Sequence, residues 1–164
     1  MKIEFGCGER PTREGFKTCD IRNLPEVDFV CAAWDIDKHV KENSVDEIWS
    51  RHFFEHLTFI QGEHVLEVWH KILKPGGVME IMLPNMTYHI AQWNNRRTEE
   101  EWQNALAGFW GWQREGDTEL WDVHKSGYDA HSLGKLLMKK GFVNVKDLKP
   151  KKVSKHLHLI CNKP

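Results

Sequence analysis

A glycine-containing bend directly follows the first apolar segment of the chain. Residues 3–7 (IEFGC) have the composition of a β-strand and run into Gly6, Cys7 and Gly8. Because glycine has no Cβ, a bend of this kind lets the backbone come into contact with a ligand. In an open parallel sheet, ligands bind outside the carboxyl ends of the strands, where this bend would lie. The bend is therefore the first candidate binding site.

A carboxylate ends the second β-rich run. Asp20 lies near the end of residues 16–21, where a carboxylate can accept hydrogen bonds from both hydroxyls of a ribose. Together with the glycine bend, Asp20 indicates a nucleoside ligand. A tight turn followed by a solvated aspartate would give the same pattern, so these residues alone leave both interpretations open.

The residues around the bend favour one kind of nucleoside. A dinucleotide fingerprint needs a small residue at its third glycine position, and this chain has Pro11 there. Residues 9–16 show no phosphate cradle, and Glu4 would repel a pyrophosphate but attract an ammonium. These features fit a nucleoside that carries a cation and an amino acid, as S-adenosylmethionine does.

The remaining pattern predicts an α/β domain. Further strands are expected at residues 27–34, 45–50, 78–83, 142–148 and 155–161, with a turn over 149–152 between the last two. A helix with a T-x-x-Q capping box at Thr58 and Gln61 precedes the strand at 78–83, which implies a right-handed parallel crossover. Its predicted buried stripe comprises Val65, Leu66, Trp69, Ile72 and Leu73.

The second half holds three shorter helices and many aromatic residues. Helices are expected over 86–93, from a second capping box formed by Thr98 and Glu101, and over 129–140, ended by Gly141. The stretch 109–128 has no clear period, and the whole region 86–128 is interpreted as a helical, aromatic insertion that either fills the core or covers an acceptor. By helical spacing Trp102 and Trp110 are assigned to the core, whereas Trp112, Trp121, His124 and Tyr128 have the setting of binding loops.

Composition limits the remaining classes. A length of 164 residues predicts one domain over 1–164, and a net charge of −1 gives no electrostatic case for a nucleic acid or an anionic membrane. No apolar run approaches the ~20 residues of a membrane span, and the first residues, MKIEFGCG, lack the apolar stretch expected of a signal peptide. The four cysteines form no C-x-x-C pair, which predicts reduced thiols and a cytoplasmic location.

The motifs, taken in chain order, resemble those of a known protein family. Across essentially the whole chain, the sequence resembles the class I (Rossmann-like) S-adenosylmethionine-dependent methyltransferases, and within them a compact group whose helices near the first strands are reduced to loops. The segments that carry the resemblance are EFGCG, GFKTCDI, SVDEIWSRHFFEHL, ILKPGGVMEIMLPN and KSGYDAHSLGKLLMKKGF. It implies a mostly parallel seven-stranded sheet, S-adenosylmethionine as cofactor and methyl transfer as the activity.

The resemblance also implies roles for residues near the cofactor. Glu4 would orient the loop or the methionine ammonium, and Gly6, Cys7 and Gly8 would line the methionine portion. Asp20 would hold the ribose hydroxyls. The residues implied around adenine and after the fourth strand are Ile21 against the ring, Trp34 as a stacking surface, Asp35 near the amino group, and Arg51 and His52 against methionine or ribose.

The acceptor is expected to be a small molecule or a sugar hydroxyl. The strand at 78–83 ends in Leu83, Pro84 and Asn85, which differs from the N/D-P-P-Y type associated with methylation of nucleobase amines. An oxygen acceptor needs a base, and a histidine suits that task near neutral pH. The candidates are His52 and His124. Because the connection after the first strand is short, one sheet face is thinly covered, and a homodimer would hide it.

Three other functions remain open: a zinc hydrolase, a module that binds S-adenosylmethionine without catalysis, and a nicotinamide oxidoreductase. His52-Phe53-Phe54-Glu55-His56 matches H-x-x-E-H, a zinc-hydrolase motif that Glu63 or Glu67 would complete. A five-residue match is easy by chance in a chain with ten histidines, so no metal ligand is assigned. The shortened loops would also suit a module that binds S-adenosylmethionine without catalysis. A nicotinamide oxidoreductase is disfavoured by Pro11.

Overall fold

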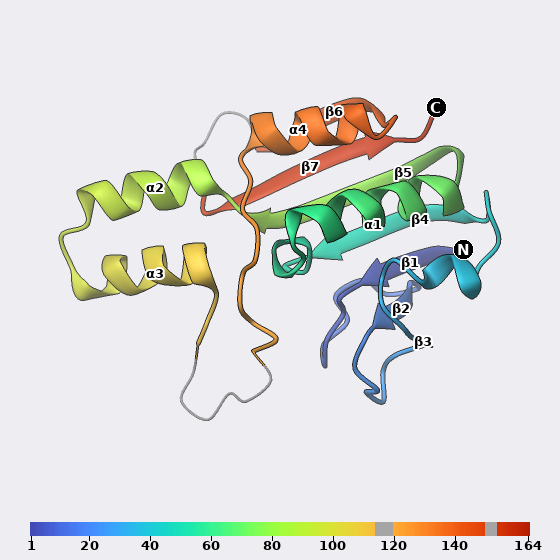
Figure 1. Ribbon diagram of the computed structural model, residues 1–164, viewed down its shortest axis with the longest axis horizontal. Coiled ribbons are helices and arrows are strands. Elements are labelled where there is room, and N and C mark those ends of the chain that lie inside the picture. Colours follow the sequence, from blue (N-terminus) through green and yellow to red (C-terminus); the bar gives the residue numbers. More distant parts are fainter. Residues whose placement is uncertain (114–119, 150–153) are drawn as a thin grey trace.

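The computed structural model describes residues 1–113, 120–149 and 154–164. Its central feature is a seven-stranded sheet in the order β3-β2-β1-β4-β5-β7-β6 (Figure 1). The first five strands in that order are parallel, and β7 is antiparallel to both β5 and β6. The α/β fold with a mostly parallel seven-stranded sheet is therefore confirmed.

Among the described residues, α-helices appear only after the fourth strand along the chain. The elements are β1 (Lys2–Phe5), β2 (Lys17–Asp20), β3 (Phe29–Val30), η1 (Ile36–Lys38), β4 (Val45–Arg51), η2 (Phe54–His56), α1 (Phe59–Ile72), β5 (Leu73–Pro84), α2 (Met86–Asn95), α3 (Glu99–Trp110), α4 (Ala130–Lys139), β6 (Val143–Asp147) and β7 (His156–Asn162). The described residues 6–16 and 21–28 form loops instead of helices. The expected reduction of the helices near the first strands is therefore present.

One face of the sheet packs against α1 and α4, which lie side by side along it in Figure 1. The predicted stripe of α1 is fully buried, and Trp69 contacts Phe5 of β1 with ring centroids 4.6 Å apart. The capping box is present, since the Thr58 hydroxyl accepts from the Gln61 N–H and the Gln61 side chain accepts from the Thr58 N–H.

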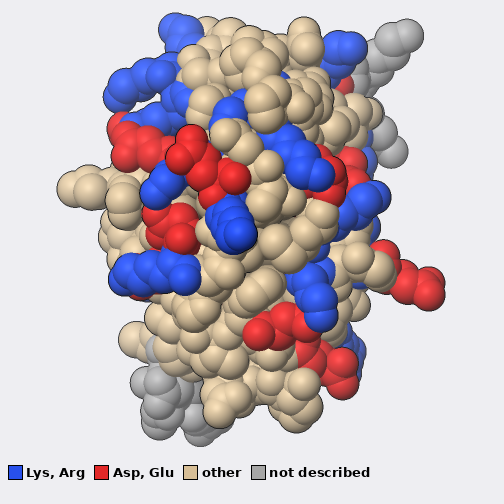
Figure 2. Space-filling view, turned by 90° about the vertical axis from the view of Figure 1, so that its right-hand side faces the viewer, with Lys and Arg blue, Asp and Glu red and all other residues tan. Residues whose placement is uncertain are grey.

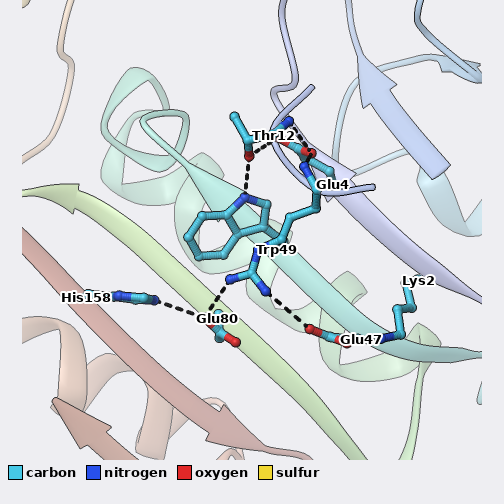
Figure 3. A network of polar contacts seen from close by, with 8 residues as sticks. Lys2, Glu4, Thr12, Glu47, Trp49, Glu80 and His158 are labelled. Atoms are coloured by element: carbon cyan, nitrogen blue, oxygen red, sulfur yellow. Dashed lines mark hydrogen bonds and ion pairs between the residues drawn. The ribbon is translucent and has the colours of Figure 1, made fainter. Parts of the chain in front are cut away.

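The other face of the sheet carries a polar network instead of helices (Figure 3). Arg13 lies 4.2 Å from the Trp49 ring centroid and donates to Glu80 at 2.9 Å, while Glu80 also contacts His158 at 3.0 Å. The Trp49 Nε1–H donates to Thr12 Oγ1 at 2.8 Å. Thus the loop after β1 is fastened across this face by polar contacts. The homodimer expected from a thinly covered face stays a prediction.

Several local predictions differ from the structure. Only Phe29–Val30 of the predicted strand 27–34 pairs in the sheet, because Asp35 N–H closes a turn onto Ala32 O and leads into η1. The box at Thr98 is incomplete, since the Glu101 carboxylate accepts from the Arg97 N–H instead. Trp110, assigned to the core, is 48 % exposed.

Two further points concern the C-terminal half. Tyr128, placed among binding-loop residues, is buried in the core and contacts Phe54. Of the turn expected over 149–152, residues 150–152 lie outside the described residues. Among the helices that are described, none combines the length and the apolar character needed to cross a bilayer.

Candidate functional site

A first cavity of about 230 Å³ opens at the carboxyl ends of β1, β2 and β4. This is the edge at which parallel sheets bind ligands. The cavity wall includes both polar and apolar side chains from the first third of the chain and from residues 120–125. Its lining residues are Gly6, Cys19, Asp20, Ile21, Arg22, Cys31, Ala32, Ala33, Trp34, His52, Phe53, His56, Leu57, Gln61, Leu120, Trp121, Asp122 and Lys125.

Of the glycine bend, Gly6 lies in this wall. Gly6 has a φ of +65°, and its N–H donates to Cys19 O at 2.8 Å, which ties the bend to β2. A Cβ on Gly6 would come within 2.4 Å of the Phe53 side chain. Glycine is therefore required here by both backbone conformation and space. The residue in close contact with Gly6 is Phe53, so the wall above the bend is partly made by the protein's own aromatic ring.

Asp20 closes the end of β2 and faces the cavity. Its carboxylate accepts from the Gly8 N–H at 2.9 Å and from the Arg22 N–H at 3.0 Å. The Arg22 guanidinium forms an ion pair with it at 3.2 Å. Sequence reasoning missed Arg22, whose only signal was a cation two residues after the carboxylate. Asp20 and Gly8 are thus joined before any ligand enters.

Glu4 is buried and serves the loop. Its two carboxylate oxygens accept from the Thr12 N–H, the Thr12 hydroxyl and the Arg13 N–H at 2.7–3.0 Å. Glu4 is not among the described residues that line the first cavity. Of the two roles implied for Glu4, this geometry serves the orientation of the loop.

The other cofactor candidates divide into two groups. Ile21 and Trp34 line the cavity and supply apolar surface. Cys7, Gly8, Asp35 and Arg51 are absent from its described lining. Asp35 forms an ion pair with Lys38, and burial raises the pKa of the Cys7 thiol to about 11, so this thiol stays protonated at neutral pH. The structure therefore does not bring these four residues to the cavity wall, although Gly8 contacts Asp20.

A second cavity of about 380 Å³ adjoins the first. His52, His56 and Asp122 line both cavities. The second cavity lies between the ends of β4 and β5 and the α2–α3 pair, toward which β4 and β5 point in Figure 1. Its lining residues are His52, Glu55, His56, Pro84, His89, Asn104, Ala107, Gly108, Trp112, Asp122, His124, Lys155 and His156.

His52 stands where the two cavities meet. It directly follows β4 with a φ of +49°, a backbone conformation that is uncommon for a residue with a side chain. Its Nδ1 lies 3.2 Å from Glu55 Oε1. Since a carboxylate only accepts, Nδ1 carries the proton and Nε2 of the neutral ring keeps its lone pair. This arrangement of carboxylate and imidazole is suited to accepting a proton.

His124 lies in the segment that follows residue 120 and also lines the second cavity. Its Nδ1 lies 3.1 Å from Gly108 O, and its Nε2 lies 3.9 Å from Glu55 Oε1. Burial lowers the pKa of His124, which favours the neutral ring. Trp112 also lines this cavity, whereas Trp121 lines the first. The insertion therefore contributes side chains to both cavities.

The H-x-x-E-H segment does not form the hydrolase arrangement that its spacing suggested. Glu63 and Glu67, the imagined third ligands, lie on α1 and form ion pairs with Lys140. His52 lies before the short helix η2 and contacts Glu55. The residue that does approach Glu55 and His56 is His124, which no local motif connects to them.

The family of the chain is shown by its similarity to known proteins. Residues 2–147 match the family model described as a methyltransferase domain. A search of curated proteins gave no significant match.

Many solved structures share the fold. A SAM-dependent methyltransferase from Archaeoglobus fulgidus is 15 % identical with a TM-score of 0.64, covering 99 % of this chain and 85 % of that chain. One from Methanosarcina mazei is 14 % identical with a TM-score of 0.64, covering 99 % and 91 %. The Burkholderia thailandensis 1,6-didemethyltoxoflavin-N1-methyltransferase, solved with bound S-adenosylhomocysteine, is 16 % identical with a TM-score of 0.61, covering 99 % and 70 %. The chain belongs to the methyltransferase domain family and is a class I S-adenosylmethionine-dependent methyltransferase.

Proposed function

We propose that the chain transfers a methyl group to a hydroxyl oxygen of a small molecule or a sugar-type acceptor held in the second cavity. The observation that carries this proposal is the shared wall of the two cavities, made by His52, His56 and Asp122. A donor in the first cavity and an acceptor in the second would meet at this wall. Holding two reactants in line in this way lowers the activation barrier of the reaction by roughly 7–11 kcal/mol.

The residues of the first cavity suit the methyl donor. Asp20 offers a buried carboxylate to ribose hydroxyls, while Ile21 and Trp34 offer apolar surface to adenine. Gly6 keeps the backbone of the bend at the cavity wall. When bound, S-adenosylmethionine supplies a methyl group on a sulfonium, and this group passes to the acceptor's lone pair while the C–S electron pair stays on sulfur.

His52 is assigned the proton-accepting role. Its Nε2 is free to accept because Nδ1 faces Glu55, and its ring lies at the junction of both cavities. The acceptor hydroxyl would give its proton to Nε2 as the new O–C bond forms. His124 lies across the second cavity and would position that hydroxyl.

The size of the second cavity favours a small acceptor. Its volume of about 380 Å³ matches ligands of a few rings at most. On the side of the molecule shown in Figure 2, which faces away from α2 and α3, Lys and Arg are interspersed with Asp and Glu. That face lacks the basic stripe with which nucleic-acid-binding proteins neutralise phosphates. Cytoplasmic location remains an expectation from the cysteines.

The test is transfer of labelled methyl groups from S-adenosylmethionine to a panel of phenols, hydroxy acids and free sugars. We expect at least one hydroxyl compound to be methylated, and we expect His52→Ala to lower kcat by about 100-fold, the usual contribution of a general base. His131→Ala, which changes an exposed histidine on α4, serves as the control. Methylation of amines alone, or donor binding with no turnover on any acceptor, would refute the proposal.

A further inference from the structure

Three potential metal ligands converge at the wall of the second cavity. Glu55, His56 and His124 each offer one ligand atom, and these atoms lie within 4.8 Å of one another. Glu55 and His56 come from η2, whereas His124 comes from the segment after residue 120. The N–H groups of Lys125 and Ser126 donate to Glu55 O, which holds the two segments together.

Among the described residues, one oxygen of Glu55 has no partner. Glu55 is 1 % exposed, and while Oε1 faces His52, Oε2 makes no hydrogen bond with the part of the chain that the structure describes. A buried carboxylate oxygen without a partner is costly, because the charge has lost its water. This atom therefore indicates that a positively charged group is still to be supplied at the cluster.

The two histidines are already oriented as metal ligands usually are. His56 Nδ1 lies 3.1 Å from Val123 O, and His124 Nδ1 lies 3.1 Å from Gly108 O. A carbonyl only accepts, so each Nδ1 carries the ring proton and the other ring nitrogen keeps its lone pair. Ligating histidines in proteins typically donate their other N–H to a backbone carbonyl in this manner.

The donor set selects the kind of ion. Two imidazoles and one carboxylate suit zinc and its first-row neighbours, whereas Mg²⁺ and Ca²⁺ prefer oxygen ligands throughout. Tetrahedral ligands at about 2.1 Å from an ion lie about 3.4 Å apart, so side-chain shifts of about an ångström close the site. Three protein ligands leave one position open, as in catalytic zinc sites.

We propose that Glu55, His56 and His124 bind a divalent transition-metal ion of the zinc type, whose open position faces the second cavity. All three residues line that cavity, so the ion would contact a molecule held there. The role of the ion rests on the proposed function. The ion would bind the acceptor hydroxyl and lower the pKa of that hydroxyl, so that His52 removes its proton more readily. This assignment departs from the sequence-based expectation of no metal ligand.

The experiment measures metal binding without any methyl donor. The chain is stripped with a chelator and titrated with Co²⁺, whose visible absorption reports low-symmetry coordination, and the ion is then displaced with Zn²⁺. We expect one equivalent to bind, and Glu55→Gln and His124→Ala each to weaken binding by at least tenfold. His131→Ala replaces an exposed histidine outside the cluster and should bind as the parent does.

Each outcome decides one of the two proposals. Failure of the parent chain to bind either ion overturns the metal site, as does unchanged affinity in Glu55→Gln or His124→Ala. If one of these variants does not fold, His56→Ala and the parent's own stoichiometry still decide. Metal binding together with absent methyl transfer would leave the site standing and refute the proposed acceptor chemistry. Methyl transfer at an unchanged rate in metal-free protein would keep the proposed function and refute the ion's role in it.

Discussion

At the scale of single residues, the backbone conformation, a hydrogen bond and a side-chain contact together fix the bend after β1. Gly6 has a positive φ, its N–H is bonded to β2, and Phe53 fills the space that a side chain would need. Gly8 donates to Asp20, so the bend and the carboxylate are one unit. The sequence predicted the glycines and Asp20 from their positions at strand ends. It could not predict Phe53 or Arg22 as their partners, because those contacts depend on how separate loops pack.

Gly6→Ala should destabilise the protein more than Gly15→Ala. Both glycines have a positive φ, so both substitutions carry backbone strain of about 1–2 kcal/mol. Only Gly6 is crowded, since nothing lies within 4 Å of a Cβ at Gly15. We expect about 1–3 kcal/mol of additional loss for Gly6→Ala in urea-induced unfolding. Equal losses in the two variants would mean that Phe53 does not restrict this position.

At the scale of elements, the strongest periodic segments were predicted best. The buried stripe and the capping box of α1 are confirmed, because both depend on short-range sequence patterns. The extent of β5 was underestimated: it begins at Leu73, which pairs with Val45 before the register shifts along β4. That pairing depends on the neighbouring strand and leaves no local signal. Trp110 was misassigned because α3 packs on α2, which leaves part of α3 exposed.

The capping box at the start of α1 should contribute measurably to stability. Thr58→Ala removes the hydroxyl that accepts from the Gln61 N–H, and we expect a loss of about 1 kcal/mol in the free energy of unfolding. Thr58→Ser keeps the hydroxyl and is the matched control, with a much smaller expected loss. The comparison is made by urea denaturation at fixed pH. Should serine cost as much as alanine, the methyl group and not the cap would explain the effect.

At the scale of the whole molecule, a short chain builds two adjoining cavities with few helices. The sheet is covered by α1 and α4 on one face, and on the other the loop carrying Thr12 and Arg13 is held by Trp49, Glu80 and their neighbours (Figures 1 and 3). The order of motifs along the chain predicted the mostly parallel sheet and the reduced helices near its first strands, but not the polar network or the pair of cavities. The convergence of Glu55, His56 and His124 was not predictable, because 67 residues lie between His56 and His124 and only tertiary packing brings them together.

The central claim is that the cavity between the bend at Gly6 and the carboxylate of Asp20 binds the methyl donor. Calorimetric titration with S-adenosylhomocysteine tests it directly. We predict one binding site in the parent chain, at least tenfold weaker binding in Asp20→Ala, equivalent to about 1.4 kcal/mol, and parental affinity in Asp46→Asn, a carboxylate at the opposite end of β4. Absence of binding by the parent chain, or equal affinities in the parent chain and Asp20→Ala, would contradict the account.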